Sequence, residues 1–138
     1  INLAGLFEEI KKEINNTNFK LNVQEKIEFN GRSSAIKRCF VNIIQNGLTY
    51  GEKVYVNVQK TPNRLIILFE DNGPGIPIEQ YKNVFKPFFR LDKSRNLNKS
   101  GVGLGLTIVE DIINSHGGNI QLGKSKYNGL QIKVSLPF

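Results

Sequence analysis

Cysteine, tryptophan, methionine and long apolar runs are scarce or absent in this chain, and these absences limit its class. A single cysteine, Cys39, excludes an internal disulfide and fits a reducing compartment. No apolar run approaches the roughly 20 residues that a membrane-spanning helix needs. The first residues also lack the signal-peptide pattern of basic residues before an apolar stretch. We therefore expect a cytoplasmic domain that makes no direct contact with a membrane.

What is present is the composition of one globular domain with a basic balance. The 138 residues suffice for a single hydrophobic core, and the apolar fraction of 39% and charged fraction of 22% are ordinary. No repeat or linker divides the chain, so residues 1–138 are expected to form one domain. The formal net charge of +7 suits an anionic ligand or partner. Charge alone does not separate a nucleotide from a nucleic acid or an acidic protein face.

The spacing of apolar residues predicts both helices and strands. Helical spacing predicts helices over residues 3–14, 35–50 and from 106 onward, with a short helical stretch at 79–84. Ser33 or Ser34 could cap the second helix. Alternation predicts strands at residues 19–23, 27–29, 54–58, 65–70, 120–122 and 130–136. Because these elements come in pairs, we expect an α+β fold: a two-layer α/β sandwich with a mixed sheet and helices packed on one face.

One turn stands out, Asp71-Asn72-Gly73-Pro74-Gly75-Ile76-Pro77. It follows the apolar run 65–69, which reads as a buried strand, so a carboxylate leaves the strand end and enters a glycine-rich turn. Glycine permits positive φ and close approach of a ligand to the backbone, and proline stiffens the turn. An ordinary turn has the same composition, so the interpretation depends on the rest of the chain.

Two other stretches could join this turn in a site. Asn42 and Asn46 lie four residues apart on one face of the predicted helix, as solvated side chains or as the wall of a site. The glycines of 101–105 precede a helix, where free backbone N–H groups attract anions. Their spacing fits neither a P-loop nor the dinucleotide fingerprint. An amide oxygen is a ligand that Mg²⁺ accepts beside phosphates, and a carboxylate can bind the amine of a base. Together these elements describe a Mg–ATP pocket.

Four motifs, in this order, resemble the catalytic ATP-binding domain of the sensor histidine kinases of two-component systems. Residues 41–47 resemble the N box of that family, 71–75 its first glycine box, 85–90 its F box and 101–105 its second glycine box. The resemblance covers essentially the whole chain and is nearest to kinases of the osmosensor type. The three aromatic residues of 85–90 would suit a hydrophobic core equally well.

The resemblance implies roles for individual residues. Asn46 would be the Mg²⁺ ligand, with Asn42 supporting the metal and phosphates, and Asp71 would bind the adenine amine. Arg90 would act near the γ-phosphate, and Leu91 to Ser100 would form a mobile ATP lid. The full ATP site would comprise Asn42, Asn46, Tyr50, Asp71, Gly73, Gly75, Ile76, Arg90, Lys99, Gly101, Val102, Gly103, Leu104, Gly105 and Leu106, with Arg90 and Asn42 as the catalytic residues.

The chain departs from the family pattern at three positions. Thr49 stands where Lys or Arg is usual, which removes a phosphate contact. Val102 stands where Thr is common, and Gly47 replaces the usual Ala. Cations of the lid, Lys93, Arg95 or Lys99, could compensate for the first two changes.

The phosphoacceptor histidine of the family is missing. The sole histidine, His116, lies in Ser-His-Gly-Gly at a predicted helix end, where we expect a structural role and a glycine-terminated helix. The family's acceptor lies on a separate helical hairpin. The expected partner is therefore a histidine-bearing dimerisation domain of the same kinase, and indirectly a response regulator. Whether the parent kinase is anchored in the inner membrane stays open.

Two rival functions differ in what they require of the sequence. Related ATP hydrolases, such as gyrase, MutL and the large heat-shock chaperones, place a glutamate base four residues before the metal-binding asparagine. Here that place holds Asn42, which cannot take a proton. A nucleic-acid module would need basic residues interleaved with exposed aromatics, whereas the aromatics here follow core spacing. Both comparisons favour a phosphotransferase that uses ATP and Mg²⁺ and binds no nucleic acid.

Overall fold

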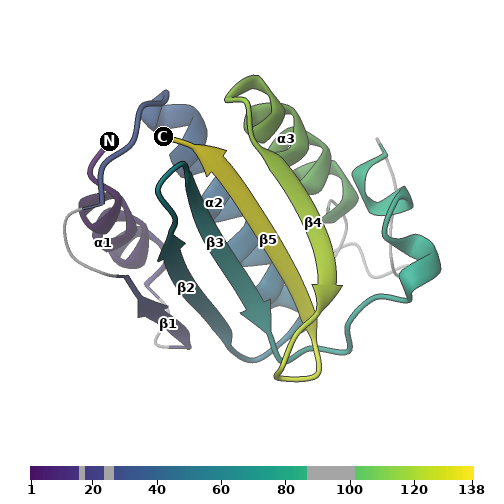
Figure 1. The fold of residues 1–138 in the computed structure, drawn as a ribbon. Helices are drawn as coiled ribbons and strands as arrows, with labels where there is room; N and C mark the ends of the chain where they lie inside the picture. The colour runs from purple at the N-terminus through teal and green to yellow at the C-terminus, as the bar shows by residue number, and fades with distance from the viewer. Residues whose placement is uncertain (16–17, 24–26, 87–101) are drawn as a thin grey trace.

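The computed structural model describes residues 1–15, 18–23, 27–86 and 102–138. It is a two-layer α+β sandwich in which one sheet is covered by helices on a single face (Figure 1). The five strands lie in the order β1-β2-β3-β5-β4. The predicted fold class is therefore confirmed. Among the described residues, no helix is long and apolar enough to cross a membrane.

The strands form a mixed sheet whose middle strand is the one that precedes the glycine-rich turn. They are β1 (Phe19–Asn22), β2 (Val54–Lys60), β3 (Arg64–Asp71), β4 (Asn119–Lys124) and β5 (Leu130–Pro137). β1 runs parallel to β2, and the other neighbours are antiparallel. In the ladder Val54 pairs with Asp71, so the last residue of β3 lies beside the first residue of β2, at one end of the strands (Figure 1).

Three helices pack on this sheet: α1 (Leu3–Ile14), α2 (Ser33–Tyr50) and α3 (Val102–Ser115). Asn2 caps α1 through its side chain, and Asn15 ends it in the left-handed conformation, which asparagine tolerates. At the end of α3, Gly117 has a φ of +76°, and the N–H of Gly118 bonds to the carbonyl oxygen of Ile113. The predicted glycine-terminated helix is therefore confirmed.

Three local predictions are wrong or need correction. Residues 27–29 form no strand of the sheet, because their backbone pairs with the start of the chain: Leu3 N–H bonds to Ile27 and Phe29 N–H to Ile1. Neither Ser33 nor Ser34 caps α2, whose N-cap is Arg32 without a side-chain cap bond. The stretch at 79–84 is two short 3₁₀ turns, η1 (Ile78–Gln80) and η2 (Asn83–Phe85).

The core fills the space between the sheet and the helices. The ring of Phe40 on α2 stacks on Phe7 of α1 at 5.2 Å and contacts Phe69 of β3 at 5.5 Å. Such aromatic contacts add about 0.5–1.5 kcal/mol each beyond area burial. Cys39 is fully buried, and this burial raises the pKa of its thiol to about 12, which agrees with an inert cysteine. The core thus presses α2 against β3, the two elements that hold the candidate site.

Candidate functional site

A pocket opens where the end of β3, the C-terminal half of α2, the glycine-rich turn and the start of β5 meet. The empty space between these elements is about 550 Å³, a figure that includes space open to solvent. The structure brings six of the predicted site residues to its lining: Asn46, Tyr50, Asp71, Gly75, Ile76 and Leu106. Most of the remaining lining is apolar: Ile43, Gly47, Val54, Phe69, Pro74, Leu130 and Ile132, with Glu70 as the exception.

Asp71 is a half-buried residue of the pocket lining, and its two carboxylate oxygens differ in their hydrogen bonds. Oδ1 accepts hydrogen bonds from the backbone N–H of Gly73 at 2.9 Å and of Leu130 at 3.1 Å. Oδ2 has no hydrogen-bond partner among the described residues. Burial raises the pKa of Asp71, and the two N–H donors oppose that rise. One oxygen is therefore fixed by the backbone, and the other is available to a donor in the pocket.

Asn72 holds the glycine-rich turn against the end of α2, a role that the sequence reasoning did not assign. Its Oδ1 accepts from the backbone N–H of Glu52 and of Lys53, both at 2.8 Å. The two segments are so close that a Cβ on Gly73 would lie 2.8 Å from the Tyr50 carbonyl oxygen. The available signal was the asparagine itself, since asparagine side chains bond to backbone groups at turns.

Gly75 is the position in the turn where positive φ is required. Its φ is +75°, a region that other residues adopt with difficulty, so the predicted conformational freedom is confirmed here. Gly73 has no positive φ and is needed instead for the close approach to Tyr50. Gly73 is not part of the pocket lining, while Ile76 is and packs against the core.

The two asparagines of α2 are not equivalent in the structure. Asn46 lines the pocket, and its Nδ2 is buried and has no hydrogen-bond partner within the described part of the chain. Asn42, one turn earlier, is half-buried and is not part of the lining. Thr49 bonds back to the carbonyl oxygen of Gln45 at 2.8 Å, so its hydroxyl is engaged within the helix. An unpaired buried amide costs about 1–3 kcal/mol, which a polar ligand would recover.

The pocket offers a cation few protein oxygens, so it suits a cation such as Mg²⁺ that is bound mainly by the phosphates of a nucleotide. Among residues 1–15, 18–23, 27–86 and 102–138, no group of three His, Cys, Asp or Glu side chains could hold a metal. Mg²⁺ usually keeps several waters and takes one or two protein oxygens beside substrate phosphates. Rotating the Asn46 amide by half a turn exchanges its Oδ1 and Nδ2. This side chain can therefore offer an acceptor to a cation or a donor to a phosphate.

Part of the predicted site lies outside the described residues: Arg90, Lys99 and Gly101, together with the predicted lid, Leu91 to Ser100. Val102, Gly103, Leu104 and Gly105 form the first turn of α3, and their backbone alone is described. Leu106 is buried and lines the pocket. Thr107 Oγ1 donates to the carbonyl oxygen of Phe85 at 2.7 Å, which joins α3 to the segment that resembles the F box. Phe85 is half-buried and packs on the core.

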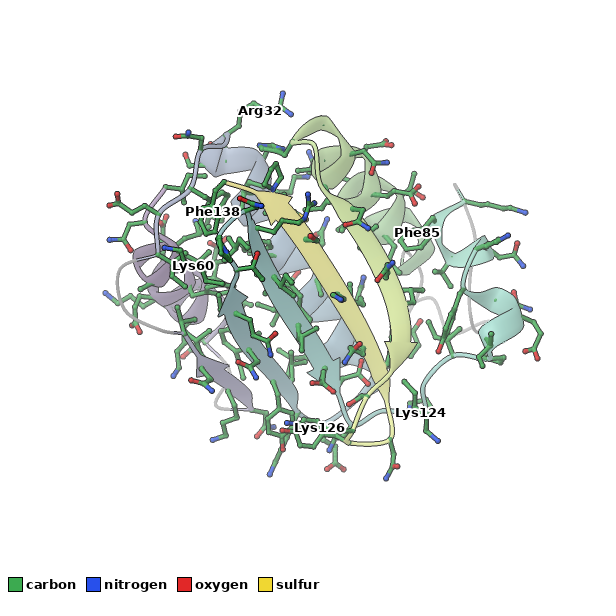
Figure 2. All side chains as sticks on the ribbon, in the orientation of Figure 1. Arg32, Lys60, Phe85, Lys124, Lys126 and Phe138 are labelled. Atoms are coloured by element: carbon green, nitrogen blue, oxygen red, sulfur yellow. The ribbon has the colours of Figure 1, made fainter. Side chains whose placement is uncertain are left out.

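His116 lies at the opposite end of α3 and has a structural role. Its Nδ1 lies 2.8 Å from the carbonyl oxygen of Ile112, and its Nε2 accepts from the backbone N–H of Arg32 at 3.1 Å. The Arg32 guanidinium also donates to Ser115 at 2.6 Å, and Figure 2 places Arg32 where α3 ends. Both ring nitrogens are engaged, which supports the structural interpretation.

Comparison with known proteins gives consistent matches. A family described as histidine kinase-, DNA gyrase B- and HSP90-like ATPase matches residues 31–138. The sensor histidine kinase GtrS of Pseudomonas aeruginosa is 35% identical over 107 residues, which is 78% of this chain and 22% of GtrS. The chain thus spans about a fifth of that relative.

Two solved structures share the fold across almost the whole chain. The mycobacterial sensor histidine kinase MprB is 25% identical with a TM-score of 0.84, covering 99% of this chain and 95% of that one. The histidine kinase domain of the Escherichia coli osmosensor EnvZ is 35% identical with a TM-score of 0.71, covering 99% and 86%. Fold, pocket and these matches together show that the chain belongs to the histidine kinase-, DNA gyrase B- and HSP90-like ATPase family, as a catalytic domain of the sensor histidine kinase type.

Proposed function

We propose that this chain binds Mg–ATP and transfers the γ-phosphoryl group to a histidine on a separate dimerisation domain of the same kinase, from which a response regulator is phosphorylated. The observation that carries the proposal is the carboxylate of Asp71 in the lining of a mostly apolar pocket. Its Oδ1 accepts two backbone hydrogen bonds, and its Oδ2 has no partner among the described residues. Adenine has a flat apolar face and an exocyclic amine donor, and these two properties match the pocket. The chain's place among the sensor histidine kinases supports the rest of the reaction.

The base would enter with its amine toward Oδ2 of Asp71. That oxygen lies toward α2, because a Cβ built on Gly47 would be 3.7 Å from it. The faces of the ring would then lie among apolar side chains such as Ile76, Leu106 and Ile132. A charge-assisted hydrogen bond in an apolar pocket is stronger than a neutral one and orients the base.

The phosphates would extend from the base toward Asn46 and the first turn of α3. The first turn of a helix directs backbone N–H groups and the positive end of its dipole toward an anion, and α3 begins at Val102. When bound, Mg²⁺ would neutralise charge on the phosphate oxygens, with Asn46 as its protein ligand. Arg90 and Lys99 are proposed to contact the phosphates from the segment outside the described residues. The transfer breaks the bond from the γ-phosphorus to the bridging oxygen and forms one to the acceptor imidazole nitrogen.

Two observations set this proposal apart from its rivals. Hydrolysis would need a base near the phosphates, but the described carboxylate on the pocket side of the sheet is Asp71 at the end of β3, and Glu70 bonds to Lys126 on the opposite face. Asn42 cannot replace a base. A single-stranded nucleic-acid platform needs exposed aromatic rings. Among the described residues, the large hydrophobic side chains classed as exposed are Ile78 and Phe138, and Phe138 lies beside Lys60, away from the pocket (Figure 2).

Calorimetric titration with ATP, in the presence and absence of Mg²⁺, tests the proposal. We expect Mg²⁺ to strengthen binding and Asn46→Ala to weaken it more than tenfold, because losing a partner of a charged group costs about 1.5–3 kcal/mol. The matched control is Asn119→Ala, an exposed asparagine on β4. Equal Mg–ATP affinity in the wild type and Asn46→Ala would remove Asn46 from the site, and no ATP binding by the wild type would refute the function.

A further inference from the structure

Two consecutive carboxylates at the end of β3 hold the same segment from opposite faces of the sheet. Glu70 Oε2 accepts from the backbone N–H of Lys126 at 3.0 Å, and Asp71 Oδ1 accepts from that of Leu130 at 3.1 Å. Neighbouring residues of a strand point to opposite faces of the sheet. The two bonds therefore hold the chain that follows β4 against the end of β3, one bond on each face. We call the clamped segment, residues 125–129, the β4–β5 turn. Figure 1 shows it at the edge where β3 ends, and Figure 2 labels Lys126 there.

An aromatic stack anchors the β4–β5 turn to the open face of the sheet. The rings of Tyr127 in the turn and Tyr55 on β2 are 3.8 Å apart and nearly parallel, at 16°. Tyr55 is the cross-strand partner of Glu70, so the stack lies beside the Glu70 bond. The turn therefore reaches past β3 to contact β2 as well.

The β4–β5 turn is also tied together internally. Ser125 is 4% exposed, and its Oγ accepts from the N–H of Tyr127 at 2.9 Å. The N–H of Ser125 bonds to the carbonyl oxygen of Gly129 at 2.9 Å, and that of Asn128 bonds to Ser125 at 3.1 Å. A turn held in this way transmits the position of its anchors to its last residue, Gly129, and to Leu130, the first residue of β5.

On the pocket side, the β4–β5 turn touches Asp71 directly. A Cβ built on Gly129 would collide with Oδ1, with the backbone carbonyl oxygen and with the carbonyl carbon of Asp71. A Cβ on Gly75 would lie 3.5 Å from the Gly129 carbonyl oxygen, so the glycine-rich turn packs on the same residue. Only a residue without a side chain lets Leu130 reach Oδ1 at this distance.

From these contacts we propose that the β4–β5 turn is a positioning element for base recognition, with Glu70, Tyr127 and Gly129 as positioning residues that set the orientation of the Asp71 carboxylate. The proposal rests on the proposed function, because it assumes that Oδ2 meets the amine of adenine. A carboxylate held through Oδ1 presents one acceptor in one direction. Released from the turn, it can rotate and accept from donors in other directions, such as the ring N–H and amine of guanine, so the preference for adenine over guanine narrows.

The test compares ATP and GTP binding in variants of the turn. Tyr127→Ala removes the stack, Gly129→Ala forces Leu130 away from Asp71, and Tyr127→Phe keeps the ring as the matched control. We expect the two alanine variants to narrow the ATP-over-GTP preference by at least about tenfold, the effect of losing roughly one hydrogen bond to a charged group. Tyr127→Phe should keep the wild-type preference. Thermal unfolding of each nucleotide-free variant verifies that it is folded. If Gly129→Ala does not fold, the ATP-over-GTP preference of Tyr127→Ala alone tests the proposal.

A second readout separates positioning from general loosening of the pocket. In wild-type protein without nucleotide, the NMR amide signal of Leu130 should move as the Asp71 carboxyl titrates, and this response should be smaller in Tyr127→Ala. Equal weakening of ATP and GTP in both alanine variants, or an unchanged preference, would overturn the positioning role alone. If the wild-type chain bound no ATP, the proposed function would fail and this inference with it.

Discussion

Asp71 is the residue at which binding and stability act against each other. Burial raises the pKa of its carboxyl, so the fold disfavours the charged form, although two backbone donors reduce the effect. A group with a raised pKa in the folded state contributes stability at acid pH, and this contribution is lost as pH rises through the raised pKa. A donor of a bound ligand at Oδ2 would stabilise the charged form further, beside the two backbone donors at Oδ1.

The first prediction concerns Asp71→Asn. An asparagine oxygen can still accept from Gly73 and Leu130, and no charge is buried, so the nucleotide-free variant should lose less stability than the wild type between acid and neutral pH. ATP binding should weaken, and a wild-type preference for ATP over GTP of at least about 100-fold should narrow. Thermal unfolding against pH and calorimetry with both nucleotides measure these effects.

The same comparison has a control in the exposed Asp111 of α3. Asp111→Asn should change neither the pH profile of unfolding nor the nucleotide preference. Wild-type ATP affinity should fall as pH is lowered through the raised pKa of Asp71. This fall should be larger than that of Asp71→Asn, in which only the nucleotide itself titrates over the same pH range. GTP binding as tight as ATP binding in the wild type would contradict the assignment of Asp71.

The second prediction concerns His116, which joins the end of α3 to the start of α2. His116→Ala should lower the free energy of unfolding by about 1 kcal/mol, because the Arg32 N–H loses its acceptor. Amide exchange at Arg32 should accelerate, while the exposed substitution Lys82→Ala should leave both quantities unchanged. His116 should also stay unlabelled when the chain is incubated alone with ATP, since both ring nitrogens are engaged. Phosphate on His116 would contradict the structural role.

At the scale of the elements, the site depends on how closely α2 approaches the sheet. A Cβ on Gly47 would lie 2.5 Å from Val54 Cγ2 on β2 and 3.5 Å from Cβ of Asp71. A Cβ on Gly47 and the Val54 side chain would therefore compete for the same space. The contact places the last turns of α2, with Asn46 and Tyr50, beside the end of β3.

The third prediction is that Gly47→Ala destabilises the chain, although alanine in a helix interior is favoured over glycine by about 1 kcal/mol. Overpacking of this kind costs about 1–3 kcal/mol. The double variant Gly47→Ala/Val54→Ala should recover part of the loss relative to the sum of the single variants, as a double-mutant cycle in chemical unfolding measures. Strict additivity would show that the two side-chain positions do not compete for one space.

At the scale of the whole molecule, the chain has a candidate nucleotide pocket and a formal net charge of +7, and it spans 22% of its relative GtrS. Among the described residues, the pocket holds no carboxylate placed as a base for water. The histidine of the chain, His116, is hydrogen-bonded to Arg32 and Ile112 at the far end of α3. Activity of the proposed kind therefore needs a second domain, with its own histidine, to meet the phosphates.

The fourth prediction follows because ATP binding and the acceptor histidine are proposed to lie on separate domains. The isolated chain should bind ATP without appreciable hydrolysis or self-labelling, and a matching histidine domain added in trans should become phosphorylated. Arg90→Ala should slow this transfer more than it weakens ATP binding, because a cation near the γ-phosphate acts on charge that shifts during transfer. Radiolabel transfer measures the rate and calorimetry the affinity. Steady hydrolysis by the chain alone would favour the hydrolase alternative.

Local patterns in the sequence determined the fold class, the end of α3 and six of the residues that line the candidate site. Helical and alternating periodicity depends on neighbours in the chain, so α2, β2 and β3 could be predicted without knowing what they pack against. Turn chemistry is equally local, which is why the positive φ of Gly75 could be expected. The roles of Arg90, Lys99 and the lid stay predictions from the resemblance.

Tertiary structure alone decided how these pieces are oriented. The bond from Leu130 to Asp71 joins residues 59 apart in sequence, and that from Arg32 to His116 joins residues 84 apart. Neither leaves a local pattern, because each depends on which strand lies beside which. For the same reason the alternation at 27–29 was misleading: its backbone donors and acceptors found partners at the start of the chain instead of in the sheet. Which oxygen of Asp71 faces the pocket is likewise a consequence of topology, since a turn distant in sequence binds the other one.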